Sequence, residues 1–380
     1  MYMSKIASTF TFLTIVLLIC RSCGPAREGN SPDAMRDPVL IDTTYTGLFD
    51  RTGEGFTGGD GTYSVELPDG RTLWIFGDTF IGGVNSDGTR QHQDPKFIRN
   101  SVVVMDGDSL TTLYRKLDGL NASFVIHPDV LEGKYQLTED SVWFWPGDGY
   151  VEENRLKLFL SEFAQKDTGM WGFRWLGTWM ASFSLPSLEQ ESLELIQTVE
   201  VTGIHFGHAV LKEGGMVYVY GLGGGKIHVA RYPAGREEGP WEYFTENGWG
   251  TDIARAAPVA PFNGSEQFSV FRYGDQYVLI TQTGGFSNEI CSYLSGTPYG
   301  PWESKRLLYT IPHPRPGMQL ITYNALAHPG LIEKGMLLIS YNVNSLVLED
   351  HYNHAWIYRP RFIRVPMWKI LDSDPHPATP

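Results

Sequence analysis

The 380-residue chain has few cysteines, few charged residues and no long helical pattern. Two of its three cysteines, Cys20 and Cys23, lie close to the N-terminus, so Cys291 alone is left for the rest of the chain. An internal disulfide framework is therefore excluded there. Charged residues make up 19% of the sequence, and 43 acidic against 30 basic side chains give a net charge of −13. This balance argues against a nucleic-acid partner, because phosphate binding requires a basic surface.

The longest apolar run lies at the N-terminus. Lys5 precedes an apolar segment at 10–19, which Cys20 follows directly. A membrane-spanning helix needs about 20 apolar residues, so we interpret residues 1–23 as a signal peptide. Its end resembles the cleavage site of bacterial lipoproteins, with Cys23 as the expected lipid attachment residue and Cys20 as the alternative. An ordinary secretory signal is the other interpretation. We expect an exported protein, lipid-anchored at the bacterial outer membrane or held in the periplasm.

The remaining sequence is predicted to form one all-β domain. Residues 24–38 are polar and rich in Gly and Pro, which is typical of a flexible tether. No comparable linker interrupts residues 39–380, so we expect a single domain there. The chain contains 42 Gly, 11 Trp, 19 Tyr and 20 Phe, a composition that favours many short strands with tight turns.

A hairpin signature occurs five times. Each copy alternates apolar residues, turns at Gly, Asp or Asn, and continues as a more apolar strand. The last four copies begin at positions 148, 208, 266 and 328, and a Gly-Pro-Trp-Glu motif occurs at both 239–242 and 300–303. A repeat of about 60 residues with four strands is typical of a propeller blade. The sequence therefore predicts a five-bladed β-propeller with four-stranded antiparallel blades, the first enlarged around 82–96 or 121–140.

The first strand of each blade lines the axis of a propeller, so the residues that open these strands should face one point. These residues are Asp60, Asp148, His208, Glu266 and His328. Any one of them could merely open a strand or turn, but five polar residues at equivalent positions favour a functional site. We expect further ligand contacts from Asp78, Arg99, Asn100, Trp145 and Asn324.

Grouped carboxylates suit the cleavage of a glycosidic bond. One must hold a proton for the leaving group, while another must be ionised to activate water or attack the sugar. Crowding raises the pKa of one carboxyl relative to another, which separates the two roles. We therefore expect Asp60, Asp148 and Glu266 to be catalytic. A divalent ion bound by such residues together with His208 and His328 is a rival use. Apart from such a cation in the channel, whose role would be structural, we expect no cofactor.

Six motifs carry a family resemblance. They are Gly59-Asp60-Gly61, Trp74-Ile75-Phe76-Gly77-Asp78-Thr79, Phe97-Ile98-Arg99-Asn100-Ser101, Trp145-Pro146-Gly147-Asp148, Ala327-His328-Pro329 and Ser340-Tyr341-Asn342. With these motifs the sequence resembles the five-bladed propeller glycosidases that include families 32 and 43. It is more closely similar to the uncharacterised-domain families 5005 and 4185 of bacterial surface proteins.

The resemblance implies glycoside hydrolysis. In such propellers an Asp of blade one acts as base or nucleophile, a second Asp orients or tunes, and a Glu acts as acid. By position these roles fall on Asp60, Asp148 and Glu266. The acid of the better-known families comes from blade three, where this chain has His208, so Glu162 and Asp78 are alternatives for that role.

We therefore expect a monomeric cell-surface glycoside hydrolase that acts on a poly- or oligosaccharide, with inversion as in most relatives. The alternative is a non-catalytic glycan-binding propeller, which would keep aromatic and histidine contacts but would not need a protonated acid. Release of products from a panel of glycans separates the two.

Overall fold

The computed structural model describes residues 38–371 except for 94–95, 170, 199–202 and 314–316. The predicted signal peptide, with Cys23, and all of the predicted tether except its last residue lie outside the described residues. The part that is described belongs to one compact unit. Within it, no helix is both long enough and apolar enough to cross a bilayer.

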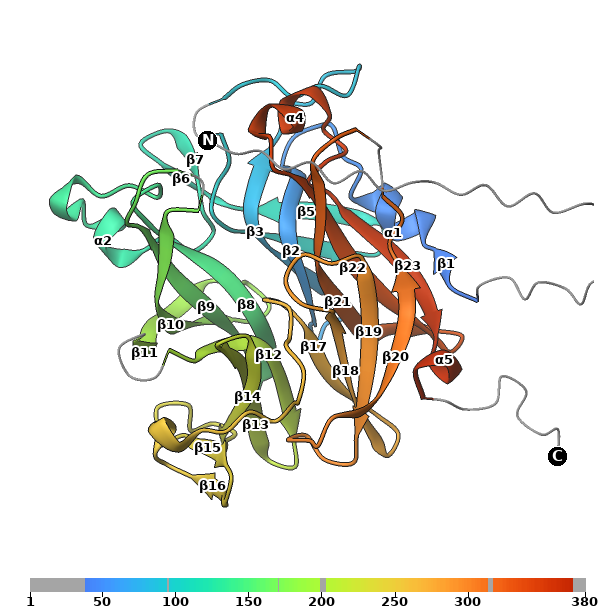
Figure 1. The fold of residues 1–380 in the computed structure, drawn as a ribbon. Helices are drawn as coiled ribbons and strands as arrows, with labels where there is room; N and C mark the ends of the chain where they lie inside the picture. The colour runs from blue at the N-terminus through green and yellow to red at the C-terminus, as the bar shows by residue number, and fades with distance from the viewer. Residues whose placement is uncertain (1–37, 94–95, 170, 199–202, 314–316, 372–380) are drawn as a thin grey trace, which may run out of the picture. The chain divides into compact units, whose positions relative to one another are not determined.

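Five antiparallel sheets form the predicted five-bladed propeller, which is confirmed (Figure 1). Blade one contains β2 (Phe56–Glu66), β3 (Thr72–Ile81), β4 (Ser101–Asp106) and β5 (Ser109–Leu113). Blade two contains β8 (Val142–Glu152), β9 (Arg155–Gln165), β10 (Phe173–Ser184) and β11 (Gln190–Thr198). Blade three contains β12 (His205–Glu213), β13 (Met216–Gly223), β14 (Lys226–Pro233), β15 (Glu242–Thr245) and a fifth strand, β16 (Gly248–Gly250).

The last two blades complete the ring. Blade four contains β17 (Ser269–Tyr273), β18 (Gln276–Gln282), β19 (Glu289–Ser295) and β20 (Glu303–Thr310). Blade five contains β21 (Leu320–Glu333), β22 (Met336–Ser345), β23 (Pro360–Pro366) and, as its outer strand, β1 (Leu40–Ile41). The inner strands contact one another in the order β2, β8, β12, β17, β21 and again β2. The repeat found in the sequence is therefore the repeat of the blades.

The two ends of the described chain close the ring in blade five. Leu40 and Ile41 pair with β23, and the helix α1 (Thr43–Leu48) follows directly. Asp42 caps α1 by accepting from the Tyr45 N–H at 2.8 Å, and it also accepts from Arg364 of β23 at 2.8 Å. This closure ties the first strand to the last one, so the ring has no open edge between blades five and one.

The core of the fold lies between blades. One cluster of buried apolar side chains fills each junction between neighbouring blades. Blades one and two share Tyr63, Leu73 and Phe144, for example, whereas Phe49 packs against Trp74 where blades five and one meet. Each inner strand therefore buries one face against each neighbour, and this holds its axial residues in place.

Blade one carries both of the expected insertions. The first connects β3 and β4 through residues 82–100, with a bridge between Val84 and Arg90. The second follows β5 and contains β6 (Arg115–Leu117), β7 (Leu120–Ala122), α2 (Pro128–Leu131) and the 3₁₀ turn η1 (Lys134–Gln136). Elsewhere, the described residues form the short helical segments η2 (Ile253–Arg255), α4 (Leu348–Asn353) and α5 (Met367–Leu371). The first insertion contacts the α4 region of blade five, where the Arg90 N–H donates to the Tyr352 carbonyl, whereas the second contacts blade two through His127 and Glu162.

Candidate active site

Asp60, Asp148 and His208 occupy equivalent positions in three neighbouring inner strands. The strand pairing skips at each of them: around Asp60 in β2, at Gly147-Asp148 in β8 and at Gly207-His208 in β12. A bulge of this kind redirects the side chain of the extra residue. The alignment of blades one to three made from the sequence is therefore the alignment that the structure has.

The alignment of blades four and five was wrong. In β21 the skip falls at Asn324-Ala325, ahead of His328, and a second irregularity follows His328. In blade four, β17 begins at Ser269, so Glu266 precedes the strand. The hairpin of blade five is longer than the others, and a constant spacing along the sequence could not show this.

Asp60 lies in a recess made by blades one and five. Its Oδ2 accepts from the Tyr323 hydroxyl at 3.0 Å, and the Tyr358 hydroxyl also donates to its carboxylate. Tyr323 in turn accepts from the Asn344 amide at 3.0 Å. Burial, reinforced by the negative charge of Asp78, raises the pKa of Asp60 to about 7. The residue is partly exposed, and the pKa of its carboxyl is raised to near neutral pH.

Gly77 makes room for this carboxylate. A Cβ atom at position 77 would lie 2.6 Å from Asp60 Oδ1 and 3.5 Å from Trp145 Cδ1. Since a contact of 2.6 Å does not occur between a Cβ and a carboxylate oxygen, a side chain at Gly77 would displace Asp60. The glycine of the Phe76-Gly77-Asp78 motif is thus a requirement of the site.

Asp78, Arg99 and Trp145 come together beside Asp60, as predicted for one site. Trp145 Nε1 donates to Asp78 Oδ1 at 2.8 Å, and the Arg99 guanidinium lies 3.4 Å from Asp78 Oδ2. Burial raises the pKa of Asp78, whereas Arg99 opposes this rise. Arg99 also lies over the Trp143 ring, 4.1 Å from its centroid. The two carboxylates are therefore held by different partners, Asp78 by cationic and indole donors and Asp60 by phenols.

Aromatic rings extend from this point across three blades. The Trp145 ring packs against Phe163 with centroids 4.7 Å apart. Trp171, from the β9–β10 connection, and Phe286, from the β18–β19 connection, have centroids 6.0 Å apart and are 57% and 60% exposed. Phe286 lies 6.1 Å from Tyr323, the partner of Asp60. Exposed aromatic faces next to carboxylates are a surface on which sugar rings can stack.

Asp148 is held by backbone donors. Its Oδ2 accepts from the Val210 N–H of blade three and its Oδ1 from the Gly149 N–H, both at 2.8 Å. Burial nevertheless raises its pKa to about 7. Burial, together with the negative charges of Asp148 and Glu266, raises the pKa of Tyr63, whose hydroxyl donates to the His208 carbonyl at 2.9 Å. Asp148 therefore lies at the axis near blades one and three.

His208 lies next to Glu266 and to His205. Its Nε2 is 3.7 Å from Glu266 Oε2, and its ring lies 4.2 Å from that of His205. Burial lowers the pKa of His208 to about 3 and that of His205 well below its usual value. Both rings are therefore neutral at pH 7, so the approach of His208 to Glu266 is not an ion pair. The Glu266 side chain is 73% exposed, yet the surrounding protein raises its pKa.

Three residues that we expected to bind substrate are buried in the fold. His328 is fully buried, and its two ring nitrogens lie 2.7 Å from Ser64 Oγ and 2.9 Å from Ser340 Oγ. Asn100 is buried, and its amide is bonded to the backbone of residues 125 and 144. Asn324 is buried with a φ of 55°, a conformation that Asn tolerates. These positions correct the prediction of ligand contacts for the three, because none of their bonds reaches the site of Asp60.

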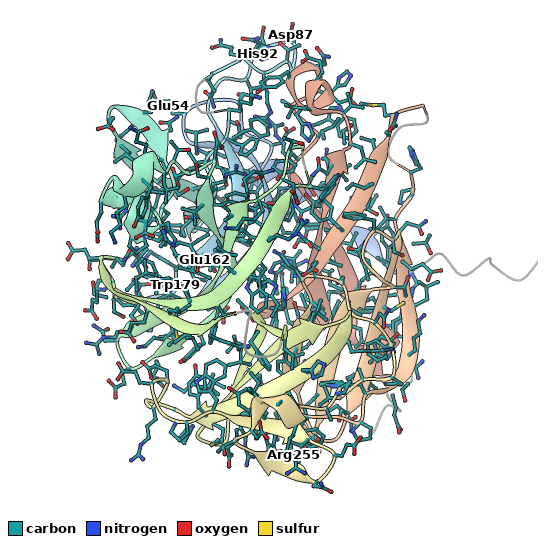
Figure 2. The ribbon with its side chains drawn as sticks, turned by 60° about the vertical axis from the view of Figure 1, so that its left-hand side comes forward. Glu54, Asp87, His92, Glu162, Trp179 and Arg255 are labelled. Carbon is teal, nitrogen blue, oxygen red and sulfur yellow. The ribbon has the colours of Figure 1, made fainter. Side chains whose placement is uncertain are left out.

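Glu162, an alternative for the acid, is also bound elsewhere. Its carboxylate accepts from Trp179 Nε1 at 2.7 Å and lies 3.4 Å from His127 of the blade-one insertion (Figure 2). It lies between blades one and two. Glu162 therefore holds the insertion against blade two.

Sequence reasoning missed the tyrosines. Tyr323 and Tyr358 both come from blade five and reach Asp60 across the ring closure. Neither lies in a repeated motif, so no periodic signal could have found them. Gly77, in contrast, belongs to the motif that contains Phe76-Gly77-Asp78, but its role follows only from the position of the Asp60 side chain.

Comparison with known proteins decides the family. Residues 42–368 match the family described as Domain of unknown function (DUF5005). The chain belongs to this family. A crystal structure described as a "putative hydrolase" from Bacteroides ovatus is 26% identical, covers 89% of this chain and 93% of its own, and has a TM-score of 0.74. No curated protein matches the sequence.

Two further solved structures match with lower TM-scores. A xylan β-1,4-xylosidase from Bacillus halodurans is 11% identical with a TM-score of 0.48, and the match covers 86% of this chain and 58% of that one. A GH43_1 enzyme from Xanthomonas citri in complex with xylose is 16% identical with a TM-score of 0.43, covering 84% and 92%.

Proposed function

We propose that this DUF5005 protein is a glycoside hydrolase that acts on a poly- or oligosaccharide. The observation that carries the proposal is the setting of Asp60. The residue is partly exposed, the pKa of its carboxyl is raised to about 7, and two tyrosine hydroxyls donate to it beside a second carboxylate. A structural carboxylate needs no such arrangement, whereas perturbed carboxyls at a propeller mouth suit acid and base roles.

Asp60 acts as the base. Its ionised form is stabilised by Tyr323 and Tyr358. The carboxylate takes a proton from the water that attacks the anomeric carbon, and the negative charge of Asp78 increases its basicity. Burial raises the pKa of Asp78, whereas Arg99 and Trp145 lower it and so favour the ionised form, in which Asp78 supplies charge and orientation.

Asp148 acts as the acid. It occupies the position equivalent to Asp60 on the neighbouring inner strand, and its pKa of about 7 keeps a proton available. After it gives this proton to the leaving oxygen, the N–H groups of Gly149 and Val210 stabilise the carboxylate that forms. Glu266, which the sequence suggested for this role, lies before β17 and is more exposed.

The substrate binds along the aromatic rings. Trp171 and Phe286 are exposed, and Phe286 lies 6.1 Å from Tyr323, so these rings offer more than one place for a sugar unit to stack. The similarity to a protein described as a hydrolase supports a hydrolytic reaction. Inversion of configuration is proposed because the sequence resembles propeller glycosidases that mostly invert.

The two roles can be separated with aryl glycosides of the sugar that is found to be cleaved. A good leaving group needs no protonation, so Asp148→Asn should keep most of its activity on activated aryl glycosides and lose it on natural linkages. Asp60→Asn should be inactive on both, and Asp275→Asn, in an exposed turn, should behave as wild type. Equal losses for Asp148→Asn on both substrate types would contradict the acid role.

The N-terminal sequence supports export and a lipid anchor at the cell surface. We propose Cys23 as the acceptor, with the propeller acting as a monomer. Metabolic labelling with a radioactive fatty acid in a bacterial host tests this. We expect label in the wild type and in Cys20→Ser but not in Cys23→Ser. Label lost only in Cys20→Ser would show that Cys20 is the lipid attachment residue.

A further inference from the structure

Three potential metal ligands gather where blades three and four meet. His205 and His208 come from β12, and Glu266 comes from the segment before β17. One ligand atom from each of the three lies within 4.8 Å of the others. The repeat in the sequence does not align His205 with His208, and Glu266, which it does align, precedes β17 in the structure.

The His208 Nε2 atom lacks a hydrogen-bond partner among the residues that the structure describes. His208 is only 5% exposed, and its backbone carbonyl is fixed by the Tyr63 hydroxyl at 2.9 Å. Glu266 Oε2 lies 3.7 Å from Nε2, which is too long for a hydrogen bond. A buried imidazole nitrogen without a partner is unfavourable, and it is aimed at a carboxylate.

The distance between these two atoms suits a shared ion. Tetrahedral Zn²⁺ with bonds of about 2.0–2.1 Å places its ligand atoms about 3.4 Å apart. His208 Nε2 and Glu266 Oε2 are 3.7 Å apart, and the exposed Glu266 side chain is free to rotate by the remaining few tenths of an ångström. A cation between the two atoms would give the buried nitrogen its missing partner.

The His205 ring is held in place by two neighbours. Its Nε2 lies 2.5 Å from Ser161 Oγ of blade two, and the Trp175 ring stacks on it at 4.5 Å with an interplanar angle of 25°. Metal-binding histidines are oriented in this way by groups around them, which fix the ring and the tautomer. The His205 ring is therefore fixed in orientation, as expected of a metal ligand.

We propose that His205, His208 and Glu266 bind a Zn²⁺-like divalent transition ion. Two imidazoles and one carboxylate suit zinc, whereas Ca²⁺ takes oxygen ligands and would gain little from two nitrogens. Three protein ligands leave a fourth position for water or for a ligand oxygen, on the side where Glu266 is exposed. The site goes beyond glycoside hydrolysis and uses neither Asp60 nor Asp148, so either proposal can fail without the other.

Metal binding by the full chain tests the proposal. The purified protein, stripped with a chelator, is titrated with ZnCl₂, with CaCl₂ and with CoCl₂ by calorimetry, and the visible absorption of Co²⁺ reports nitrogen ligands. Glu266→Gln removes an exposed ligand without touching the core, and His208→Asn removes the buried one. Glu246→Gln, in the exposed turn between β15 and β16, is the matched control.

We expect about one Zn²⁺ per chain, no competition by Ca²⁺, and a loss of affinity of about tenfold or more in Glu266→Gln and His208→Asn but not in Glu246→Gln. Unchanged zinc affinity in Glu266→Gln would overturn the proposal. So would the absence of zinc binding by the wild type, or Ca²⁺ that displaces Zn²⁺. If His208→Asn does not fold, Glu266→Gln decides alone.

Discussion

The Tyr323 hydroxyl donates a hydrogen bond to Asp60 Oδ2 at 3.0 Å, joining blade five to blade one at the candidate base. This bond stabilises the ionised carboxylate, so it lowers a pKa that burial and Asp78 raise. The balance among these effects sets the pH at which Asp60 can accept a proton.

Tyr323→Phe should therefore raise the pKa of Asp60. Because the base must be ionised, the ascending limb of kcat/KM should move to higher pH, and activity below pH 7 should fall by about tenfold or more. A pH profile of kcat/KM measures this. Tyr135→Phe, at an 89% exposed position, is the control and should leave the profile unchanged. A Tyr323→Phe profile that overlays the wild type would show that Asp60 is not the base.

Gly77→Ala should displace the Asp60 carboxylate, since the new Cβ would lie 2.6 Å from Oδ1. A shift of about 1 Å in a reacting group can cost about 100-fold in rate, so we expect a loss of this size in kcat/KM with the fold retained. Circular dichroism and steady-state kinetics measure the two. Gly296→Ala has open space around its Cβ and should be neutral. Full activity in Gly77→Ala would mean that Asp60 can leave its recess without loss.

The dependence of activity on pH should be a narrow bell. Asp60 must be ionised and Asp148 protonated, and both have a pKa raised to about 7. The active combination is therefore lost below pH 7 as Asp60 gains a proton, and above pH 7 as Asp148 loses one. The profile of kcat/KM should peak near pH 7. A broad plateau that extends to pH 9 would exclude Asp148 as the acid.

His328→Ala should reduce stability without changing substrate affinity. The substitution leaves Ser64 and Ser340 without their shared partner in the core, at a cost of about 1–3 kcal/mol. Denaturant unfolding should show this loss, while KM at a temperature where the variant is folded should stay at the wild-type value. A raised KM with unchanged stability would show that His328 contacts the substrate after all.

The fold could be predicted because the blades recur as a repeat that is visible in the sequence. The buried hairpins and the two Gly-Pro-Trp-Glu motifs recur at nearly constant spacing, and both tryptophans are buried, Trp241 and Trp302. The axial alignment could be predicted for the first three blades only, since a strand bulge at Asp60, Asp148 and His208 marks the same level. The longer hairpin of blade five shifted His328 off this level.

The partners of Asp60 could not be predicted. Tyr323 and Tyr358 reach Asp60 across the ring closure, and Gly77 makes room for it within blade one. These contacts depend on side-chain positions that the spacing of the repeats does not record. The pairing of His205 with Glu266 depends in the same way on two blades that meet in space. Residue type could suggest a site at the axis, but only the contacts separate catalytic groups from those that hold blades together.

The most direct test of the central claim is the release of reducing ends from a panel of plant and microbial glycans, with the full chain and with Asp60→Asn. We predict that the wild type releases product from at least one glycan. Asp60→Asn should still bind that glycan and release none. Binding by the wild type without any release, or full release by Asp60→Asn, would contradict the account and favour a glycan-binding propeller.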